Sequence, residues 1–269
     1  MTLYADNLKT LTISDLAAMK QVGEKISCLT AYDASFSALL DSVGIDIMLI
    51  GDSLGMVIQG HGSTLPVTVE DMVYHSRSVA AARKRAFVVT DLPFASYATP
   101  EQALHNAARL MQAGAAQMVK LEGTKIAVIQ FLVEQGIPVC GHLGLLPQSV
   151  NRLGGYKVQG RDEQQAKRIV EDAESIEQAG AGLLVLECVP AALAAQISNR
   201  LSIPVIGIGA GVDCDGQVLV LYDMLAISIG KRPRFSKNFM AEADSIVSAV
   251  RRYHQAVKSA QFPGPEHSY

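Results

Sequence analysis

The chain has 269 residues, of which 49% are hydrophobic and 18% are charged, and its formal net charge is −3. This charge balance, together with the absence of tryptophan and a 6% aromatic content, argues against partners such as nucleic acid or an anionic membrane. No secretory signal or membrane span is expected, because the N-terminus has no basic segment followed by an apolar one and every long apolar stretch is interrupted by a charge, glycine or proline.

Short runs rich in β-branched residues alternate along the chain with longer amphipathic segments. The predicted strands are residues 25–31, 45–50, 86–91, 116–122, 137–142, 182–187, 203–209 and 223–228. The predicted helices between them are residues 33–43, 69–84, 100–113, 124–135, 162–179, 190–200 and about 213–221. Two more helices are expected at the ends, at 14–21 and 238–259. The first of them would either close the bottom of the sheet or pack beside it.

Eight apolar strands separated by helices indicate a parallel sheet that is covered on both faces. Eight units without a linker are typical of a closed (β/α)8 TIM barrel. We therefore expect a single domain over residues 1–269, with a barrel core at about 25–230 and a C-terminal helical extension at about 236–260. A doubly wound open sheet is the alternative, but LTAYDAS at 29–35 is not the GxGxxG turn that usually follows its first strand.

The four cysteines, Cys28, Cys140, Cys188 and Cys214, are far apart in the sequence. They form no CxxC pair and have no zinc-ligand spacing with histidine, and three of them lie in or beside predicted strands. This pattern predicts reduced, buried thiols in a cytoplasmic protein.

Polar residues stand where most of the predicted strands end, and in barrels that end carries the chemistry. In strand order they are Asp33, Asp52 with Ser53, Asp91, Lys120 with Glu122, His142 and Glu187. Each has a structural alternative: a helix cap for Asp52-Ser53, a turn for Asp91, a salt bridge for Lys120 and Glu122, and a hydrogen-bonded core position for His142. Their number on one side favours a common site.

Three carboxylates in this set, Asp52, Asp91 and Glu122, would repel one another without a cation between them. Oxygen ligands select a hard ion, which predicts Mg²⁺ bound together with waters and substrate oxygens. Such an ion can chelate a 2-oxo acid and stabilise the enolate that forms when a base removes the neighbouring proton. Glu187 follows the apolar LLVL, so burial should raise its pKa toward that of a general base. The set therefore predicts carbon–carbon bond chemistry at an enolisable centre without naming a substrate.

Two glycine-containing loops are open to two interpretations each. IGIGAG at 206–211 is either a phosphate cradle or a place where the backbone approaches another group closely. The long connection 143–161 has no clear helical period. It is either an active-site loop, hinged at Gly154-Gly155 and carrying Lys157 and Arg161 toward an anionic substrate, or an ordinary solvated loop.

Eight stretches of the chain together resemble the ketopantoate hydroxymethyltransferase family and run in family order. They are LTAYD (29–33), IGDSLGMV (50–57), TDLPF (90–94), VKLEG (119–123), PVCGHLGLLPQSV (138–150), GGYKVQGR (154–161), LLVLECVP (183–190) and IPVIGIGAG (203–211).

The resemblance implies the barrel fold and a reaction: a one-carbon unit passes from 5,10-methylenetetrahydrofolate to 3-methyl-2-oxobutanoate, giving 2-dehydropantoate. It implies Asp52 and Asp91 as Mg²⁺ ligands, with Glu122 as a ligand directly or through water. Asp52, Ser53, Asp91, Lys120 and His142 are the implied contacts to the substrate, and Glu187 is the implied base. The enolate would attack the folate methylene with water excluded by the 143–161 loop. A cytoplasmic homo-oligomer, a homodecamer in bacterial members, is also implied.

Two alternatives to this function are weighed. A Mg²⁺-dependent lyase or mutase for phosphoenolpyruvate-like or isocitrate-like substrates would use the same type of barrel, but that class commonly relies on a cysteine in a loop after a middle strand, and Cys140 lies within a predicted strand. A non-catalytic metabolite-binding barrel would have no need of Glu187 beside a metal.

Overall fold

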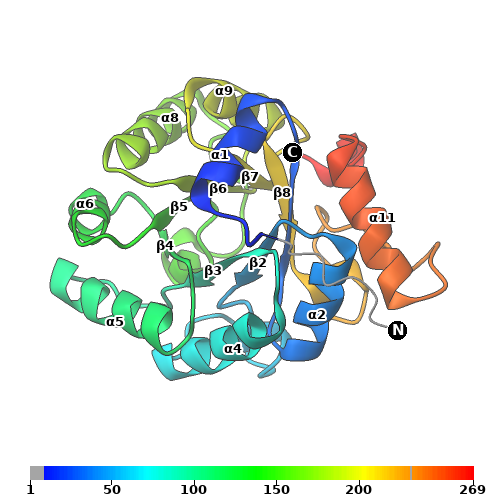
Figure 1. Ribbon diagram of the computed structural model, residues 1–269. Helices are drawn as coiled ribbons and strands as arrows, with labels where there is room; N and C mark the ends of the chain where they lie inside the picture. The colour runs from blue at the N-terminus through cyan, green and yellow to red at the C-terminus, as the bar shows by residue number, and fades with distance from the viewer. Residues whose placement is uncertain (1–8, 231) are drawn as a thin grey trace.

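Eight short, buried strands pair in parallel, in sequence order, and β8 pairs with β1 to close a barrel (Figure 1). The computed structural model describes residues 9–230 and 232–269. The strands are β1 Ile26–Thr30, β2 Ile47–Ile50, β3 Phe87–Asp91, β4 Met118–Glu122, β5 Val139–Gly144, β6 Leu183–Glu187, β7 Val205–Ile208 and β8 Gly216–Leu219. The prediction of a closed parallel barrel is confirmed, and the open-sheet alternative is excluded.

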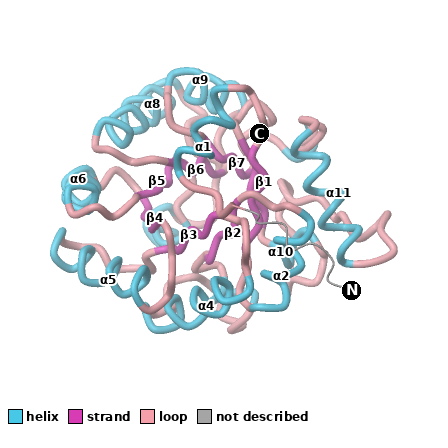
Figure 2. The backbone as a smooth tube through the Cα atoms, viewed as in Figure 1, coloured by secondary structure: helices cyan, strands magenta, loops and turns pink. Residues whose placement is uncertain are grey.

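Helices surround the barrel as an outer ring (Figure 2). The long ones between strands are α2 Ala34–Val43, α4 Val69–Ala82, α5 Pro100–Gln112, α6 Ile126–Glu134, α8 Glu163–Gln178 and α9 Ala191–Arg200. Shorter ones are α3 Leu54–Val57, α7 Val150–Leu153 and α10 Leu221–Met224, with 3₁₀ turns η1 Pro147–Ser149 and η2 Pro265–His267. Several begin at a side-chain cap; Asp33, for example, accepts a hydrogen bond from the Phe36 N–H.

The first helix, α1 Ile13–Gln21, closes the N-terminal end of the barrel. Its Leu16 and Met19 pack against strand side chains that point into the barrel, such as Phe87 and Met118. This settles the position left open by the sequence, because α1 lies across the barrel end and not beside it. Successive side chains of a strand point to opposite faces, and those that do not point into the barrel pack outward against the helices. All four cysteines are free and buried, as predicted.

The eighth strand was predicted at 223–228 and a helix at about 213–221, and both predictions are wrong. β8 lies at 216–219 inside the predicted helix, and α10 begins at Leu221. The apolar run from Val218 to Ala226 contains no glycine or proline to separate a strand from a helix. The strand is instead fixed by pairing: a Cβ on Gly216 would lie 2.4 Å from the Ile26 carbonyl oxygen, so only glycine allows β8 to approach β1 this closely.

The C-terminal helix α11 Ile246–Lys258 completes the outer ring beside α2 and β8 (Figure 1). The buried Tyr253 hydroxyl lies 2.8 Å from the carbonyl oxygens of Cys28 in β1 and Gln217 in β8. The helix expected as an extension therefore occupies the position of the barrel's own eighth helix.

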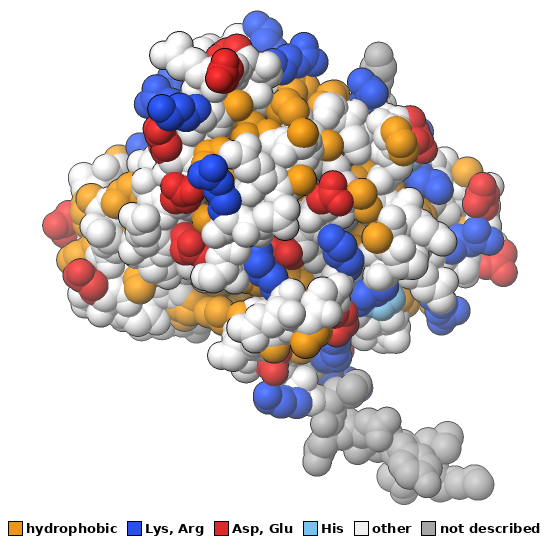
Figure 3. Space-filling model, turned by 90° about the horizontal axis from the view of Figure 1, so that it is seen from above, with side chains coloured by type: hydrophobic (Ala, Val, Ile, Leu, Met, Phe, Trp, Pro, Cys, Tyr) orange, Lys and Arg blue, Asp and Glu red, His pale blue; other side chains and the backbone are white. Residues whose placement is uncertain are grey.

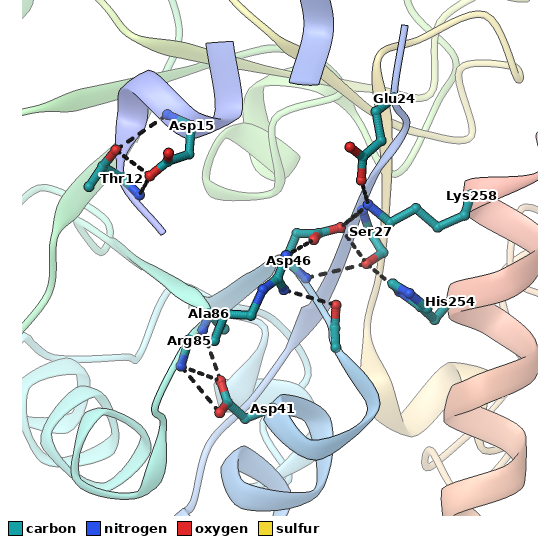
Figure 4. Close-up of polar contacts among 11 residues, drawn as sticks. Thr12, Asp15, Glu24, Ser27, Asp41, Asp46, Arg85, Ala86, His254 and Lys258 are labelled. Carbon is teal, nitrogen blue, oxygen red and sulfur yellow. Dashed lines mark hydrogen bonds and ion pairs between the residues drawn. The ribbon is translucent and has the colours of Figure 1, made fainter. Parts of the chain in front are cut away.

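A buried aspartate ties α11 to the barrel near its N-terminal end (Figure 4). Asp46 receives the Arg85 guanidinium on Oδ1 at 3.0 Å and the Lys258 ammonium on Oδ2 at 2.8 Å. The Ser27 hydroxyl donates to Asp46 and lies 2.9 Å from Nδ1 of His254. Burial by itself raises the pKa of Asp46, but Lys258 and the hydrogen bonds outweigh burial and lower it.

We expect Asp46→Asn to lower the free energy of unfolding at neutral pH by about 2 kcal/mol, because two largely buried cations lose their counter-charge. The lowered pKa means that the ionised carboxylate stabilises the fold at neutral pH and that this contribution is lost as pH falls through the folded-state pKa. The urea unfolding free energies of the variant and the wild type should therefore converge as the pH falls below about 3.9, the ordinary pKa of an aspartate. The exposed Glu134→Gln on α6 is the control, and an equal deficit at neutral and acidic pH would contradict an ionic role.

The described residues contain no helix long and apolar enough to cross a membrane. On the face drawn in Figure 3, acidic and basic side chains are interspersed, with no broad area of one sign.

Candidate active site

The C-terminal ends of the strands open into a cavity of about 480 Å³. All seven side chains predicted for the site line it: Asp52, Ser53, Asp91, Lys120, Glu122, His142 and Glu187. Parallel strands of one barrel present their C-terminal ends at the same mouth, which is why residues up to 135 positions apart meet here. Asp33 does not join them, since it caps α2.

Asp52 and Ser53 follow β2 and face the cavity instead of capping α3. Neither side chain makes a capping hydrogen bond to that helix. The Asp52 N–H donates to Oδ2 of Asp91 at 3.1 Å, and the Ser53 hydroxyl lies 2.9 Å from the Tyr32 hydroxyl. A Cβ on Gly51 would come within 2.8 Å of the Ser53 Oγ, so the glycine keeps room for this polar corner.

Lys120 forms an ion pair with Asp91 on the neighbouring strand, and its sequence neighbour Glu122 lies elsewhere in the site. The Lys120 Nζ is 2.9 Å from Oδ1 of Asp91, and both side chains are buried. Burial disfavours the ammonium, but the charges of Asp91, Asp52 and Glu122 outweigh it and raise the pKa of Lys120. Lys120 is therefore a permanent positive charge in the cavity floor.

If Asp52 and Glu122 were ionised together with Asp91, their negative charge would exceed the single positive charge of Lys120. Burial, followed by repulsion from Asp91, raises the pKa of Asp52 to about 7. Burial and the charge of Asp52 raise the pKa of Glu122 well above its ordinary value. Two carboxyl groups in the site thus retain protons near neutrality unless another cation joins them.

His142 lies between two acids, with Nδ1 3.7 Å from Glu122 and Nε2 3.3 Å from Glu187. Burial, reinforced by the charge of Lys120, lowers the pKa of His142 well below its usual range, so the ring is neutral. Within the described part of the chain, neither ring nitrogen makes a hydrogen bond. A neutral ring with one N–H is available to a substrate oxygen.

Glu187 ends β6 with its side chain 14% exposed, toward the cavity. Burial raises the pKa of Glu187 to about 7. A carboxylate with this pKa can accept a proton from carbon and release it again near neutral pH.

The donor set at this end of the barrel fits a hard divalent cation. Carboxylate oxygens predominate among the possible ligands and exceed the positive charge present, and His142 adds a ring nitrogen. Across residues 9–230 and 232–269, no three His, Cys, Asp or Glu side chains already form a complete ligand set. Asp52, Asp91 and Glu122 all line the cavity, and each already has a protein partner: Gln148 donates to Asp52 and Glu122, and Lys120 pairs with Asp91. A set of two or three carboxylates that leaves positions for water and substrate suits Mg²⁺.

The sequence did not reveal two residues that hold the carboxylates in place. The buried side-chain amide of Gln148 donates to Asp52 Oδ2 at 2.8 Å and to the Leu92 carbonyl at 2.9 Å. The Tyr97 hydroxyl donates to the amide oxygen of Gln148 and lies 3.3 Å from the Glu122 N–H. Gln148 looked like one polar residue among many in a long loop, and no local pattern marked it as buried.

The 143–161 connection contains short helical segments that were not predicted, and the two basic residues expected at the site lie in different places. It contains η1 and α7, and then Tyr156, Lys157 and Val158 line the cavity. Gly154 and Gly155 have positive φ values of 66° and 111° and end α7. Arg161 does not line this cavity and lies in a neighbouring groove.

Two glycines of IGIGAG, Gly209 and Gly211, lie in close contact with other residues of the protein. A Cβ on Gly209 would lie 3.0 Å from Phe235 and 3.1 Å from the Tyr269 ring, and one on Gly211 would lie 2.6 Å from Ala191. Of the two interpretations of this loop, close approach agrees with the packing at Gly209 and Gly211.

Comparison with known proteins extends over nearly the whole chain. The sequence profile of a family described as ketopantoate hydroxymethyltransferase matches residues 10–265. The chain is 58% identical over 261 residues to 3-methyl-2-oxobutanoate hydroxymethyltransferase of Nitrosococcus oceani, covering 96% of this chain and 99% of that protein. It is also 58% identical over 269 residues to 3-methyl-2-oxobutanoate hydroxymethyltransferase 1 of Burkholderia cenocepacia, covering 99% of each.

Solved structures with a similar fold are much more distant in sequence. Phosphonopyruvate hydrolase in complex with oxalate and Mg²⁺ superposes with a TM-score of 0.60 at 10% identity, over 95% of this chain and 92% of that one. For 2,3-dimethylmalate lyase, a member of the PEP mutase/isocitrate lyase superfamily, the TM-score is 0.58 at 14% identity, over 94% and 98% of the two chains. At this distance the likeness concerns the barrel fold alone.

Proposed function

Because the chain belongs to the ketopantoate hydroxymethyltransferase family, and is thus an enzyme of the transferase class, we propose that it transfers a hydroxymethyl unit from 5,10-methylenetetrahydrofolate to 3-methyl-2-oxobutanoate. The product, 2-dehydropantoate, would serve pantothenate biosynthesis. The observation that carries the chemistry is the placement of a desolvated carboxylate, Glu187, in the same cavity as Lys120 and the Asp52–Asp91 pair.

Substrate binding is assigned to the charged floor of the cavity and its polar rim. Lys120 attracts the carboxylate of the 2-oxo acid, and Ser53 with the backbone around Asp52 offers hydrogen bonds to its oxygens. Asp52 and Asp91 would hold Mg²⁺, which neutralises negative charge as it develops on the 2-oxo group. Neutral His142, whose ring nitrogens are unpaired within the described residues, is suited to donate its N–H to a substrate oxygen.

Glu187 is the group best placed to remove the proton from C3 of the oxo acid. The C–H electron pair moves into the C2–C3 bond, the carbonyl oxygen takes up the charge, and Glu187 holds the proton. Water attacks the folate methylene and both of its carbon–nitrogen bonds break, which releases formaldehyde and tetrahydrofolate. C3 of the enolate then attacks the formaldehyde carbon, the C=O π pair moves to oxygen, and that oxygen takes a proton to become the product hydroxyl. Water must therefore reach the methylene, whereas it must be kept from protonating the enolate carbon.

The family resemblance also supports a cytoplasmic homo-oligomer, a homodecamer, as part of the proposal. Exposed apolar side chains such as Tyr74 on α4 and Phe94 after β3, 59% and 50% exposed, would be partly covered in such an assembly.

The proposed function is tested by incubating the purified protein with Mg²⁺, 3-methyl-2-oxobutanoate and 5,10-methylenetetrahydrofolate and following 2-dehydropantoate by NMR. Phosphonopyruvate and 2,3-dimethylmalate in parallel reactions probe the lyase and mutase alternative. Product from the first mixture alone is expected. Turnover of either alternative substrate without 2-dehydropantoate would overturn the proposal.

The rate should depend on pH through the ionisation of Glu187. The base acts when deprotonated, and its pKa is about 7, so kcat/KM at saturating Mg²⁺ should rise about tenfold from about pH 6 to about pH 8 and then level. Saturating Mg²⁺ keeps Asp52 ionised, and the profile of Glu122→Gln separates the titration of Glu122, whose pKa is also raised, from that of Glu187. A steady-state pH profile measures this, and a rate that does not change across this window would exclude Glu187 as the base.

A further inference from the structure

One residue contacts the ends of all three strands that lead into the carboxylates of the site. Gln148 lies in η1, in the connection after β5, and its side chain is buried. Its amide nitrogen donates to Oδ2 of Asp52, after β2, at 2.8 Å, and to the carbonyl oxygen of Leu92, directly after Asp91 of β3, at 2.9 Å. Its backbone N–H donates to Oε2 of Glu122, at the end of β4, at 3.1 Å. Gln148 therefore links the three strand ends to one another.

Tyr97 fixes the orientation of the Gln148 amide. The buried Tyr97 hydroxyl donates to the amide oxygen of Gln148, and its own oxygen accepts the backbone N–H of Glu122 at 3.3 Å. Because the amide oxygen is already bound, the amide nitrogen has to face Asp52 and Leu92, where both of its protons are used. The hydrogen bonds thus form a closed ring from Gln148 through Tyr97 and Glu122 back to Gln148.

This ring decides which carboxylate oxygens are offered to a cation. Gln148 occupies Oδ2 of Asp52 and Oε2 of Glu122, and it leaves Oδ1 and Oε1 to a metal, a water or the substrate. A carboxylate held in this way can give a metal one oxygen but not two. Mg²⁺ keeps several waters and uses few carboxylate oxygens in near-octahedral geometry, whereas Ca²⁺ takes about six to eight oxygens and accepts bidentate carboxylates. The ring therefore favours the smaller ion.

We propose that Gln148 is a positioning residue that makes the site selective for Mg²⁺ over Ca²⁺, because it limits Asp52 and Glu122 to one oxygen each. The inference rests on the proposed function, in which these acids and Asp91 serve a Mg²⁺ site. Groups that hydrogen-bond to metal ligands orient them, and loss of such a group typically costs about 10- to 100-fold in metal affinity. Tyr97 supports Gln148 in this role through the orientation of its amide.

The test measures metal binding directly. Mn²⁺ is titrated into the wild type, Gln148→Met and Tyr97→Phe and followed by its spin-resonance signal, and Mg²⁺ and Ca²⁺ are then added as competitors. Methionine keeps the length of glutamine but has no amide. We expect Gln148→Met to weaken Mg²⁺ binding about 10- to 30-fold and Ca²⁺ binding about threefold or less. Tyr97→Phe, which loses one hydroxyl, should reduce the preference for Mg²⁺ by a smaller factor, about threefold. Gln261→Met, at an exposed position, is the matched control.

The possible outcomes separate this inference from the proposed function. A wild type that binds Mg²⁺ and makes 2-dehydropantoate, with variants that bind both metals as the wild type does, would overturn this inference alone. Equal losses for Mg²⁺ and Ca²⁺ would contradict selection between them. Tighter Mg²⁺ binding in Gln148→Met would show that the amide competes with the cation. A wild type that binds no Mg²⁺ would overturn the metal site of the proposed function as well. Thermal melts without metal check the fold of each variant, and Tyr97→Phe decides the test if Gln148→Met is unfolded.

Discussion

Replacement of Glu187 by Gln is expected to lower kcat about 10³-fold, while the KM for 3-methyl-2-oxobutanoate changes little. The amide has nearly the same shape as the carboxylate but cannot accept the C3 proton, and a positioned base contributes about 10²- to 10⁴-fold. The substrate contacts at Lys120 and Ser53 are untouched. Steady-state kinetics with both substrates measures the effect.

The stability of the same variant separates a catalytic from a structural role. Because burial raises the pKa of Glu187, its ionised form opposes folding at neutral pH, and the neutral amide should leave the thermal midpoint unchanged or higher. Glu134→Gln, at an exposed position near the end of α6, serves as the control for handling and expression. A variant that loses stability and keeps its kcat would show that Glu187 serves the fold.

Asp91→Asn is expected to weaken Mg²⁺ binding about 100-fold, while the charges of Asp52 and Glu122, which still act on Lys120, limit the loss of stability. The substitution removes one charged oxygen from the proposed ligand pair and the partner of Lys120, while the amide oxygen can still accept the Asp52 N–H. Competition between Mg²⁺ and Mn²⁺, followed by the Mn²⁺ spin-resonance signal, gives the affinity. Glu134→Gln, at an exposed position on α6, is the surface control. A large loss of stability with unchanged Mg²⁺ affinity would favour the turn-forming role for Asp91.

The barrel was predictable because glycine and turn-forming residues separate most of its strands from its helices. Gly44 after α2 and Gly180 after α8 mark chain reversals, and the strands that follow are continuous apolar runs. The last unit lacks such residues: β8 passes into α10 through Val220 without a glycine or proline. There the pairing of β8 with β1 determines the conformation. A pairing between residues so far apart in the sequence cannot be predicted from the local sequence pattern.

The site was predictable to the extent that parallel strands share one polarity. Asp52, Asp91 and Glu187 are found at strand ends in the sequence, and strand ends converge in space. The partner of Lys120 was not predictable, because the pairing of β3 with β4 places Asp91 opposite it. Gln148 and Tyr97 come from connections, whose path over the barrel mouth depends on tertiary packing.

The barrel does not by itself distinguish the proposed reaction from those of its structural neighbours. Phosphonopyruvate hydrolase and 2,3-dimethylmalate lyase share the fold at 10% and 14% identity. The family match and the 58% identical relatives provide the distinction, since they extend over nearly the full chain. The cysteines do not add to this distinction, because Cys140 is buried within β5 whereas Cys188, directly after β6, lines the cavity.

The central claim is that Glu187 removes the C3 proton of a 2-oxo acid in a site completed by Mg²⁺. It is tested most directly by incubating the wild-type protein with 3-methyl-2-oxobutanoate and Mg²⁺ in D₂O, without folate, and following the C3 proton by NMR. The account predicts loss of the C3 signal by deuterium exchange, abolished by EDTA and slowed about 10³-fold in Glu187→Gln. A C3 proton that persists with wild-type protein and Mg²⁺, or that exchanges equally fast in the variant, would contradict it.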